Sequence, residues 1–465
     1  MSNKKKEAVY DVEIENLAFG GRGIARIEGM VVFVEGCIPG DFVKAKIFKR
    51  KKQFAEARAI EILRPSPKRT EPKCDYFGTC GGCRWQFLDY KDQLEYKTNH
   101  VKEAFSHIGM FEDIDVLNAL GSPDVFNYRN KMEFSFTNSR WLTPDELEDK
   151  DIEKGNGIGL HVPGFYSKIV DIKKCLIQPE KGNEILDEIR NFMLNSDHEV
   201  YDERSHKGFW RFIMMRHSVF NNSFMINIVT GYEDLEEIKK LSEILTNNFP
   251  EISSVLNNVS GKKASISRGD YEILIHGKDH IIEKLGDFEF SISANSFFQT
   301  NTKGAKQLYD VVKDFADLKG GEFVFDLYTG TGSIAIYLSK YAKKILGIEI
   351  VESAIKDARK NCELNNISNC EFITGDLKDV IKDLNETPDV LVCDPPRAGM
   401  HKDVVNKIME LSPKKIVYVS CNPSTMARDC AILKEKYELV KVQPVDMFPH
   451  TYHIEAVAEL VLKGQ

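Results

Sequence analysis

The sequence lacks a long hydrophobic run: no apolar stretch among its 465 residues approaches the roughly 20 residues that span a bilayer. Its first 16 residues carry basic side chains but no apolar segment of the kind found in secretory signals. These absences argue against a membrane partner and predict a cytoplasmic protein. In a reducing compartment, the ten cysteines indicate metal binding or catalysis rather than disulfides.

The chain also lacks the basic balance typical of nucleic-acid-binding proteins, because its formal net charge is −8. The charge is unevenly distributed, however. Residues 1–70 contain 15 Lys and Arg against 9 Asp and Glu, and six of these basic residues fall between Lys44 and Lys52. Such a cluster suits phosphate groups, although a solvated loop without a ligand has the same composition.

Residues 8–63 alternate short apolar strands with turns at Gly20-Gly21, Gly29 and Pro39-Gly40. Evenly spaced short strands predict a small barrel. Together with the sequences GGRGIAR and IPGD, this segment resembles the TRAM domain, an OB-like RNA-binding barrel. Pro65-Ser-Pro67 marks a linker, so we place this domain at residues 1–64.

Three cysteines follow in ten residues with the spacing C-x5-C-x2-C: Cys74, Cys80 and Cys83. This spacing calls for a fourth ligand, and Cys175 stands alone in a region without other thiols. Four thiolates bind either zinc or an iron–sulfur cluster. Zinc ribbons usually contain two C-x2-C hooks, and only one is present here, which favours a cluster and leaves zinc as the alternative.

The middle of the chain, residues 127–285, is rich in strand-like patterns, and residues 88–107 have helical periodicity. Arg211 and Arg216 lie in this region and are candidates for RNA contacts, with ordinary strand positions as the alternative. We assign residues 65–285 to a central iron–sulfur and RNA-binding domain.

From about residue 320 the pattern changes to alternating strands and helices, which predicts a parallel sheet. A glycine-rich turn at Gly330 and Gly332 follows a buried strand, and the next three strands end at Glu349, Asp376 and Asp394. The turn has no third glycine, so it lacks the full pattern that a dinucleotide favours. S-adenosylmethionine therefore fits better than a nicotinamide cofactor.

Cys421 ends the next strand and so is expected at the same sheet edge as the methyl donor. A cysteine there is either a buried structural thiol or a nucleophile. Methylation of uracil at C5 needs such a thiol, because addition at C6 turns the ring into an enolate. A base must then remove the C5 proton, and the residues alone leave Glu455, His450 and His453 as candidates.

The sequences DLYTGTGSI, CDPPRAG, VSCNPSTMARD, HTYHIEAV and SFFQTN, read with the cysteine spacing, resemble the RNA uracil-5-methyltransferase family. The likeness is greatest to bacterial 23S ribosomal RNA members with a TRAM domain and a [4Fe-4S] cluster. It implies an α/β multidomain fold whose Rossmann-like methyltransferase domain covers residues 286–465, with residues 88–118 packed against it. The implied residues are Cys421 as nucleophile, Glu455 as base, Cys74, Cys80, Cys83 and Cys175 around the cluster, and Gln299, Tyr328, Gly330, Glu349, Asp376 and Asp394 around S-adenosylmethionine.

The resulting prediction is a monomeric enzyme that methylates C5 of uridine in 23S ribosomal RNA. Transfer RNA is the alternative substrate, and the barrel and cluster argue against it because transfer-RNA members resemble the catalytic half without those parts. Two other hypotheses are methylation of an exocyclic amine, which needs no thiol, and a non-catalytic RNA-binding assembly factor.

Overall fold

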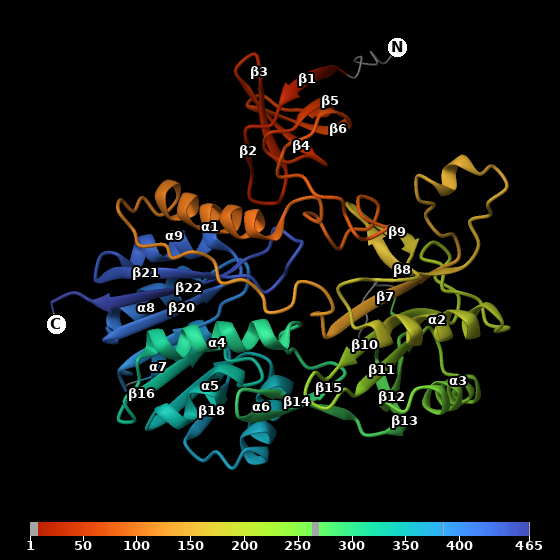
Figure 1. Cartoon of the computed structure of the whole chain (residues 1–465). Helices are drawn as coiled ribbons and strands as arrows, with labels where there is room; N and C mark the ends of the chain where they lie inside the picture. The colour runs from red at the N-terminus through yellow and green to blue at the C-terminus, as the bar shows by residue number, and fades with distance from the viewer. Residues whose placement is uncertain (1–7, 263–268, 385, 465) are drawn as a thin grey trace.

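The computed structural model describes residues 8–262, 269–384 and 386–464, arranged around three large β-sheets and one two-stranded ribbon. Figure 1 shows the N-terminal sheet standing above the other two, which lie side by side. The first seven residues, which belong to the predicted barrel segment, lie outside the described residues. Within the described ranges, no helix has the length and apolar character that would let it cross a membrane.

The N-terminal sheet has the strand order β1-β5-β6-β4-β3-β2. Alternate residues of its strands are buried, among them Val32, Val34, Val43 and Ala45, as expected for a small β-structure with one face turned inward. Its strands are β1 (Val9–Glu13), β2 (Asn16–Leu17), β3 (Gly23–Ile27), β4 (Met30–Glu35), β5 (Phe42–Arg50) and β6 (Phe54–Arg64).

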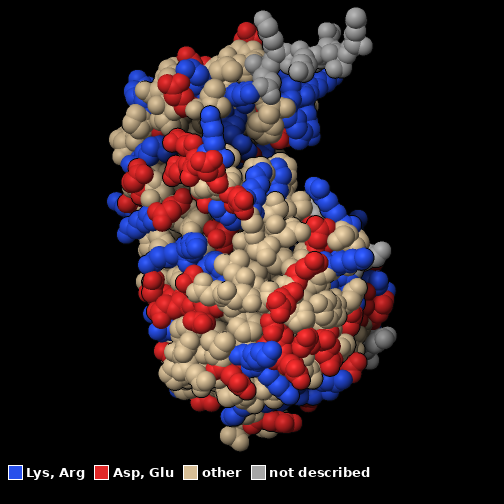
Figure 2. All heavy atoms as spheres, turned by 90° about the vertical axis from the view of Figure 1, so that its right-hand side faces the viewer, with Lys and Arg blue, Asp and Glu red and all other residues tan. Residues whose placement is uncertain are grey.

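The basic cluster lies on β5 and the turn that follows it. Residues 49–52 are exposed, and Figure 2 shows Lys and Arg gathered on this part of the molecule. Lys44 and Lys49 form ion pairs with Glu61 and Glu56 across the neighbouring strand, so part of the positive charge is neutralised within the barrel.

The central sheet has the order β13-β12-β11-β10-β7-β8-β9. Helices α2 and α3 pack their apolar residues on one face, where Phe134, Phe136 and Ile213 are buried. The elements are β7 (Lys131–Thr137), β8 (Gly157–Val162), β9 (Phe165–Asp171), α2 (Glu180–Leu194), β10 (Trp210–His217), β11 (Phe224–Thr230), α3 (Leu235–Asn248), β12 (Ile252–Val259) and β13 (Tyr271–Gly277), with a short 3-10 helix at Glu146–Glu148. The ribbon of β14 (His280–Leu285) and β15 (Phe288–Ser293) follows.

The C-terminal sheet has the order β18-β17-β16-β19-β20-β22-β21, with the first five strands parallel and β22 antiparallel to both of its neighbours. The chain reverses its winding direction at β16, which pairs with β17 on one side and β19 on the other. This arrangement confirms the predicted Rossmann-like fold and places a ligand site at the carboxyl ends of these strands.

Helices cover both faces of this sheet (Figure 1). Apolar residues of α4, α5 and α6 fill the core on one face, and those of α1, α7, α8 and α9 fill it on the other. The elements are α4 (Thr302–Ala316), β16 (Phe323–Leu327), α5 (Ser333–Leu338), a 3-10 helix (Ser339–Tyr341), β17 (Lys344–Glu349), α6 (Glu352–Leu364), β18 (Cys370–Thr374), α7 (Leu377–Asp383), β19 (Val390–Cys393), α8 (Lys402–Leu411), β20 (Lys415–Ser420), α9 (Pro423–Leu433), β21 (Tyr437–Val445) and β22 (Glu455–Leu462).

Helix α1 (Tyr90–His107) lies far from this sheet in sequence but packs on it, against α9 and β21. A buried ion pair fixes the contact: the Lys97 ammonium lies 2.6 Å from the Asp446 carboxylate, and both side chains are fully buried. The Tyr90 hydroxyl donates a second hydrogen bond to Asp446, at 3.0 Å. The loop that leads from β21 to the start of β22 is thereby anchored to α1.

Replacing Lys97 with methionine is expected to reduce the free energy of unfolding by roughly 3–5 kcal/mol, because Asp446 would remain buried without its counter-charge. Urea denaturation measures the change. Lys91→Met, at an exposed position of the same helix, is the matched control and should change stability by less than about 0.5 kcal/mol. Equal stability of the two variants would show that the ion pair does not hold α1 in place.

Candidate active site

Five predicted site residues meet at one edge of the C-terminal sheet. Tyr328, Glu349, Asp394 and Cys421 each stand at or directly after the carboxyl end of a parallel strand. Glu455 begins β22, which runs in the opposite direction, and the pairing of Ser420 with Ala456 brings it to the same edge. The topology therefore gathers residues that are separated by more than 100 positions in the sequence.

The loop after β16 has an unusual backbone. Tyr328, Gly330 and Gly332 have φ angles of 63°, 56° and 76°, in the left-handed region. The amide of Gly330 donates to a carboxylate oxygen of Glu349 at 3.1 Å, which ties the loop to the end of β17. A Cβ atom added at Gly330 would have no neighbour within 4 Å, so the backbone here borders open space that a ligand can occupy.

Asp326, on β16 just before this loop, is a residue that the sequence analysis missed. It is fully buried, and one of its carboxylate oxygens accepts hydrogen bonds from the Thr329 hydroxyl and the Ala335 amide. Burial raises the pKa of Asp326 to about 7, despite these hydrogen bonds. Its position at the start of DLYTGTG was the available signal, and its contacts show that it shapes the loop.

Gln299 and Asp394 approach the loop from other segments. Gln299 hydrogen-bonds the Tyr309 hydroxyl, which also lies 2.7 Å from the Ser333 hydroxyl at the start of α5. Burial, followed by repulsion from Asp326, raises the pKa of Asp394 to about 7. Hydrogen bonds tie the glycine turn to Glu349 and, through the Thr331 hydroxyl, to the carbonyl of Phe297, two residues before Gln299.

Asp376 has a structural partner. Its carboxylate caps α7 by accepting from the Lys378 amide at 3.1 Å, and it forms an ion pair with the Lys378 ammonium. This ion pair and the capping bond lower its pKa. Its binding role stays a prediction, because the contacts that the structure shows are explained by helix capping.

Cys421 lies in a group of interacting charges. Burial and, next, the charge of Glu455 raise the pKa of its thiol to about 11, whereas the charge of Arg397 acts to lower it. Glu455 is only 6% exposed, and burial together with repulsion from Asp394 raises its pKa well above the usual range. The charge of Glu455 therefore acts on the Cys421 thiol, and both groups stand at the same edge of the sheet.

Arg397 is a second residue that the sequence analysis did not assign. It follows Asp394 in the DPPR turn, and its carbonyl accepts from the Asn422 amide group at 3.0 Å and from the Thr425 hydroxyl at 3.3 Å. These bonds join the turn after β19 to the turn after β20. They hold a cation beside Cys421, where it favours the thiolate.

The two histidines differ in role. His450 is buried, stacks on Phe126 with ring centroids 4.4 Å apart, and has Nδ1 3.2 Å from the Gln93 amide nitrogen, so it belongs to the packing against α1. His453 is partly exposed, and burial, followed by the charge of Arg397, lowers its pKa to about 4. Of the two histidines, His453 therefore remains as the alternative to Glu455 for the role of base.

The four predicted ligand cysteines line one small cavity between the cysteine loop and the central sheet. Burial raises the pKa of Cys80 and Cys83 to about 12, and the neighbouring thiols add to the shift. Yet no group of three or more His, Cys, Asp or Glu side chains in the described ranges is arranged to hold a metal ion. The residue types suit a cluster, whereas the side-chain arrangement does not itself form a metal site.

Two family models match the chain. The model described as tRNA (uracil-5-)-methyltransferase covers residues 234–463, which include the whole sheet edge described above, and the TRAM domain model covers residues 4–60. An RNA methyltransferase of Chlorobaculum tepidum is 44% identical over 93% of this chain and 91% of the relative. The chain belongs to the RNA uracil-5-methyltransferase family.

Two further comparisons extend over the whole chain. An RNA methyltransferase of Bacteroides thetaiotaomicron is 41% identical over 96% of this chain and 100% of its own. The crystal structure of Pyrococcus abyssi tRNA (uracil-54, C5)-methyltransferase in complex with S-adenosyl-L-homocysteine has a TM-score of 0.74 and 31% identity, over 97% of this chain and 100% of that one. The protein is thus an S-adenosylmethionine-dependent RNA uracil-5-methyltransferase with an N-terminal TRAM domain, and the prediction that it is an enzyme is confirmed.

Proposed function

We propose that this methyltransferase acts as a cytoplasmic monomer on C5 of a uridine in 23S ribosomal RNA, with Cys421 as nucleophile and Glu455 as base. The observation that carries the proposal is the placement of Cys421 and Glu455 at the same edge of the sheet, where the charges of Glu455 and Arg397 act on the thiol. Methylation of an exocyclic amine would use neither the thiol nor the base.

The reaction follows from these groups. The Cys421 thiolate adds to C6 of uracil, and the electron pair of the C5–C6 double bond moves to C5 and the O4 carbonyl. S-adenosylmethionine, when bound, supplies an electrophilic methyl group that C5 takes. Glu455 then removes the proton from C5, the double bond reforms, and the C6–sulfur bond breaks to release the thiolate.

The residues around the glycine turn would hold the methyl donor. Glu349 ends β17, where an acidic residue is placed to bind ribose hydroxyls, and Asp394 directly follows β19 at the same edge of the sheet. Gln299 and the backbone at Tyr328 and Gly330 complete the predicted set. Asp376, at the end of β18, would contribute through the carboxylate oxygens that cap α7.

We further propose that Cys74, Cys80, Cys83 and Cys175 hold a [4Fe-4S] cluster with a structural role. Their grouping around one cavity supports this. The backbone amides of Arg84 and Trp85, directly after Cys83, donate to the His450 carbonyl at 2.8 and 3.0 Å. A cluster would thereby stiffen the segment that leads to Glu455.

Anaerobically purified protein is expected to contain iron and acid-labile sulfide at about four of each per chain. Cys175→Ser should lose both and unfold at a lower temperature, since the cysteine loop would no longer be tied to the central sheet. Cys370→Ser, outside the cavity, should retain both. One zinc ion per chain in place of iron would overturn the proposal of an iron–sulfur cluster and support a zinc site.

Transfer RNA is the second candidate substrate, and a specific observation favours it. The archaeal transfer-RNA enzyme matches 97% of this chain, including the N-terminal barrel region. The argument that transfer-RNA members lack the N-terminal barrel is therefore wrong for this enzyme. The case for ribosomal RNA now rests on the sequence resemblance to bacterial members alone.

In the deciding experiment, the enzyme is incubated with methyl-labelled S-adenosylmethionine and with unmodified transcripts of either 23S ribosomal RNA or transfer RNAs. The labelled nucleosides in each RNA are then identified. Labelled 5-methyluridine in the ribosomal transcript alone is the expected result. Label in transfer RNA alone would show that transfer RNA, and not 23S ribosomal RNA, is the substrate. Label in a nucleoside methylated on an exocyclic amine would overturn the proposed chemistry.

A further inference from the structure

A groove on the central sheet lies outside the catalytic edge. Its cavity has a volume of about 390 Å³ and opens on the face of β7 that carries Ser135 and Thr137. Phe134 and Phe136 point to the opposite face, where α2 and α3 pack, because successive side chains of a strand alternate. A second cavity shares Asn138, Asp202 and Arg204 with the first, so the groove continues along the sheet.

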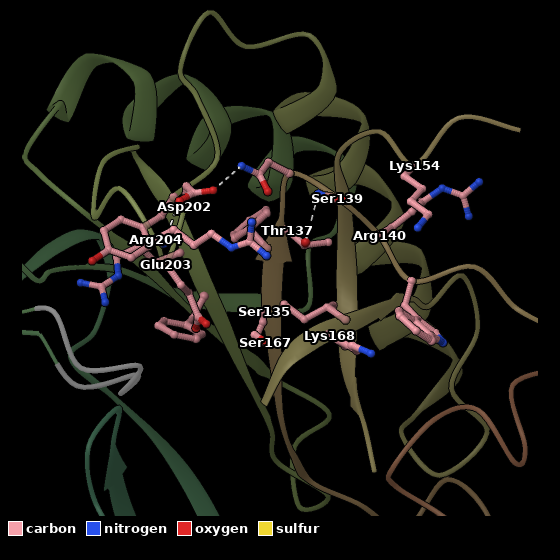
Figure 3. Close-up of a pocket in the computed structure, with 17 residues that line it drawn as sticks. Ser135, Thr137, Ser139, Arg140, Lys154, Ser167, Lys168, Asp202, Glu203 and Arg204 are labelled. Atoms are coloured by element: carbon pink, nitrogen blue, oxygen red, sulfur yellow. Dashed lines mark hydrogen bonds between the residues drawn. The ribbon is translucent and has the colours of Figure 1, made fainter. Parts of the chain in front are cut away.

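The groove is rich in positive charge. Figure 3 shows Arg204 on one side and Arg140 and Lys154 on the other, with Thr137 between them. Lys168 and Arg211 also line the groove, as do two acidic residues, Asp202 and Glu203. The five cations outnumber these two acids; Arg140 is paired with Glu146, whereas Arg204 and Lys154 are exposed.

The Asp202 carboxylate is occupied by hydrogen bonds within the groove wall. It accepts from the Asn138 amide group at 3.1 Å and from the amides of Arg204 and Ser205 at 2.7 Å. These bonds lower its pKa to about 2. Asp202 therefore remains ionised, but its carboxylate oxygens are held against the wall by these hydrogen bonds.

Aromatic rings accompany the cations. The Lys168 ammonium lies 4.0 Å from the ring centre of Trp141 and 4.2 Å from that of Phe165, which is 51% exposed. The Arg211 guanidinium lies 4.1 Å from the ring centre of Tyr201. Trp141 and Tyr201, which line the groove, are partly exposed, and cations beside such rings form the kind of surface on which single-stranded nucleic acid stacks its bases while its phosphates are neutralised.

Strand β7 links this groove to the catalytic edge. Its first residue, Lys131, follows Asn130, whose side chain donates to the Gln299 carbonyl at 3.0 Å. Arg129, one position earlier, contributes to the lowered pKa of His453. The strand then runs for about 20 Å, at roughly 3.3 Å per residue, to Thr137 in the groove.

Arg216, by contrast, is not an RNA contact. It is 4% exposed, and its guanidinium donates to the carbonyls of Ala294 and Ser296. Arg211 lines the groove but is also mostly buried and donates to the carbonyls of Ser260 and Lys262. The cations that reach an incoming strand are the exposed ones.

We propose that this groove binds a single-stranded segment of the substrate RNA that flanks the target uridine, with Lys154 and Arg204 as phosphate contacts and Trp141 as a stacking surface. The inference rests on the proposed function, because it places the flanking strand of the same RNA. A protein partner would favour a drier and less charged surface.

The test compares the double variant Lys154→Glu/Arg204→Glu with the wild-type enzyme and with Lys239→Glu/Lys240→Glu, a charge-matched control on the exposed side of α3. The substrate is the transcript that the wild type methylates, in full length and in nested truncations around the methylated uridine. With the full-length RNA, KM is expected to rise about tenfold or more in the groove variant, with kcat within about twofold. The slope of log affinity against log salt should shrink by about 2.

Truncation separates direct contact from a general defect. Once the flanking segment is removed, the wild type and the groove variant should have equal KM values, whereas the control should follow the wild type with every RNA. An unchanged KM for the full-length RNA, or a deficit that persists with every truncation, would overturn the inference. A wild type that methylates no uridine refutes the proposed function, and the affinity of fluorescent RNA for the same three proteins then still tests the groove.

Discussion

Replacing Cys421 with alanine is expected to lower the rate of methyl transfer by about 10⁴-fold or more, because C5 of uracil is a poor nucleophile without a bond at C6. RNA affinity should stay within a few-fold, since the side chain is small and partly exposed. Single-turnover methyl transfer to the substrate RNA measures the loss. The loss is large because removing the group that forms the covalent bond abolishes a chemical step. Removing a binding contact would only weaken the binding of the RNA.

A covalent trap makes the same test independent of rate. In RNA that carries 5-fluorouridine at the target position, no proton can leave C5 after methylation, so the protein–RNA bond should survive denaturation. The wild type and Cys370→Ala, a partly buried cysteine on β18, should both form this adduct, and Cys421→Ala should not. An adduct formed by Cys421→Ala would assign the nucleophile to another cysteine.

The sequence predicted that these residues gather at one edge of the sheet because the information needed for that prediction is local. Each of Glu349, Asp394 and Cys421 follows an apolar strand directly, and parallel strands place their carboxyl ends together. The positions of these residues after predicted strands were therefore enough to predict that they lie at the same edge of the sheet.

The electrostatics of the site could not be predicted in this way. The effect of Arg397 on Cys421 depends on how two turns, 24 residues apart in the sequence, bond to each other through Asn422 and Thr425. His450 looked equivalent to His453 in the sequence, but Gln93, 357 positions away, draws it into the packing of α1. Arg216 was likewise a candidate RNA contact because it is a cation, but the structure buries it and bonds it to backbone carbonyls.

Loss of the base is expected to have the opposite effect to loss of the nucleophile: the covalent protein–RNA adduct should accumulate instead of failing to form. Glu455→Gln removes the group that takes the C5 proton but retains its shape, so RNA with ordinary uridine should be methylated and then remain bonded to Cys421. Turnover should fall by about 10²- to 10⁴-fold, the usual contribution of a general base. A denaturing gel should show methyl label in the protein–RNA adduct.

The pH dependence of this variant gives a second and independent readout. After burial, the charge of Glu455 is the next largest cause that raises the pKa of Cys421, so neutralising it should lower that pKa from about 11. The thiolate would then form at lower pH, and adduct formation in Glu455→Gln should reach its half-maximal rate at a lower pH than in the wild type. His453→Asn, which leaves Glu455 intact, should turn over without accumulating adduct. If His453→Asn accumulates the adduct and Glu455→Gln turns over freely, the histidine is the base and Glu455 acts only on the charge of the thiol.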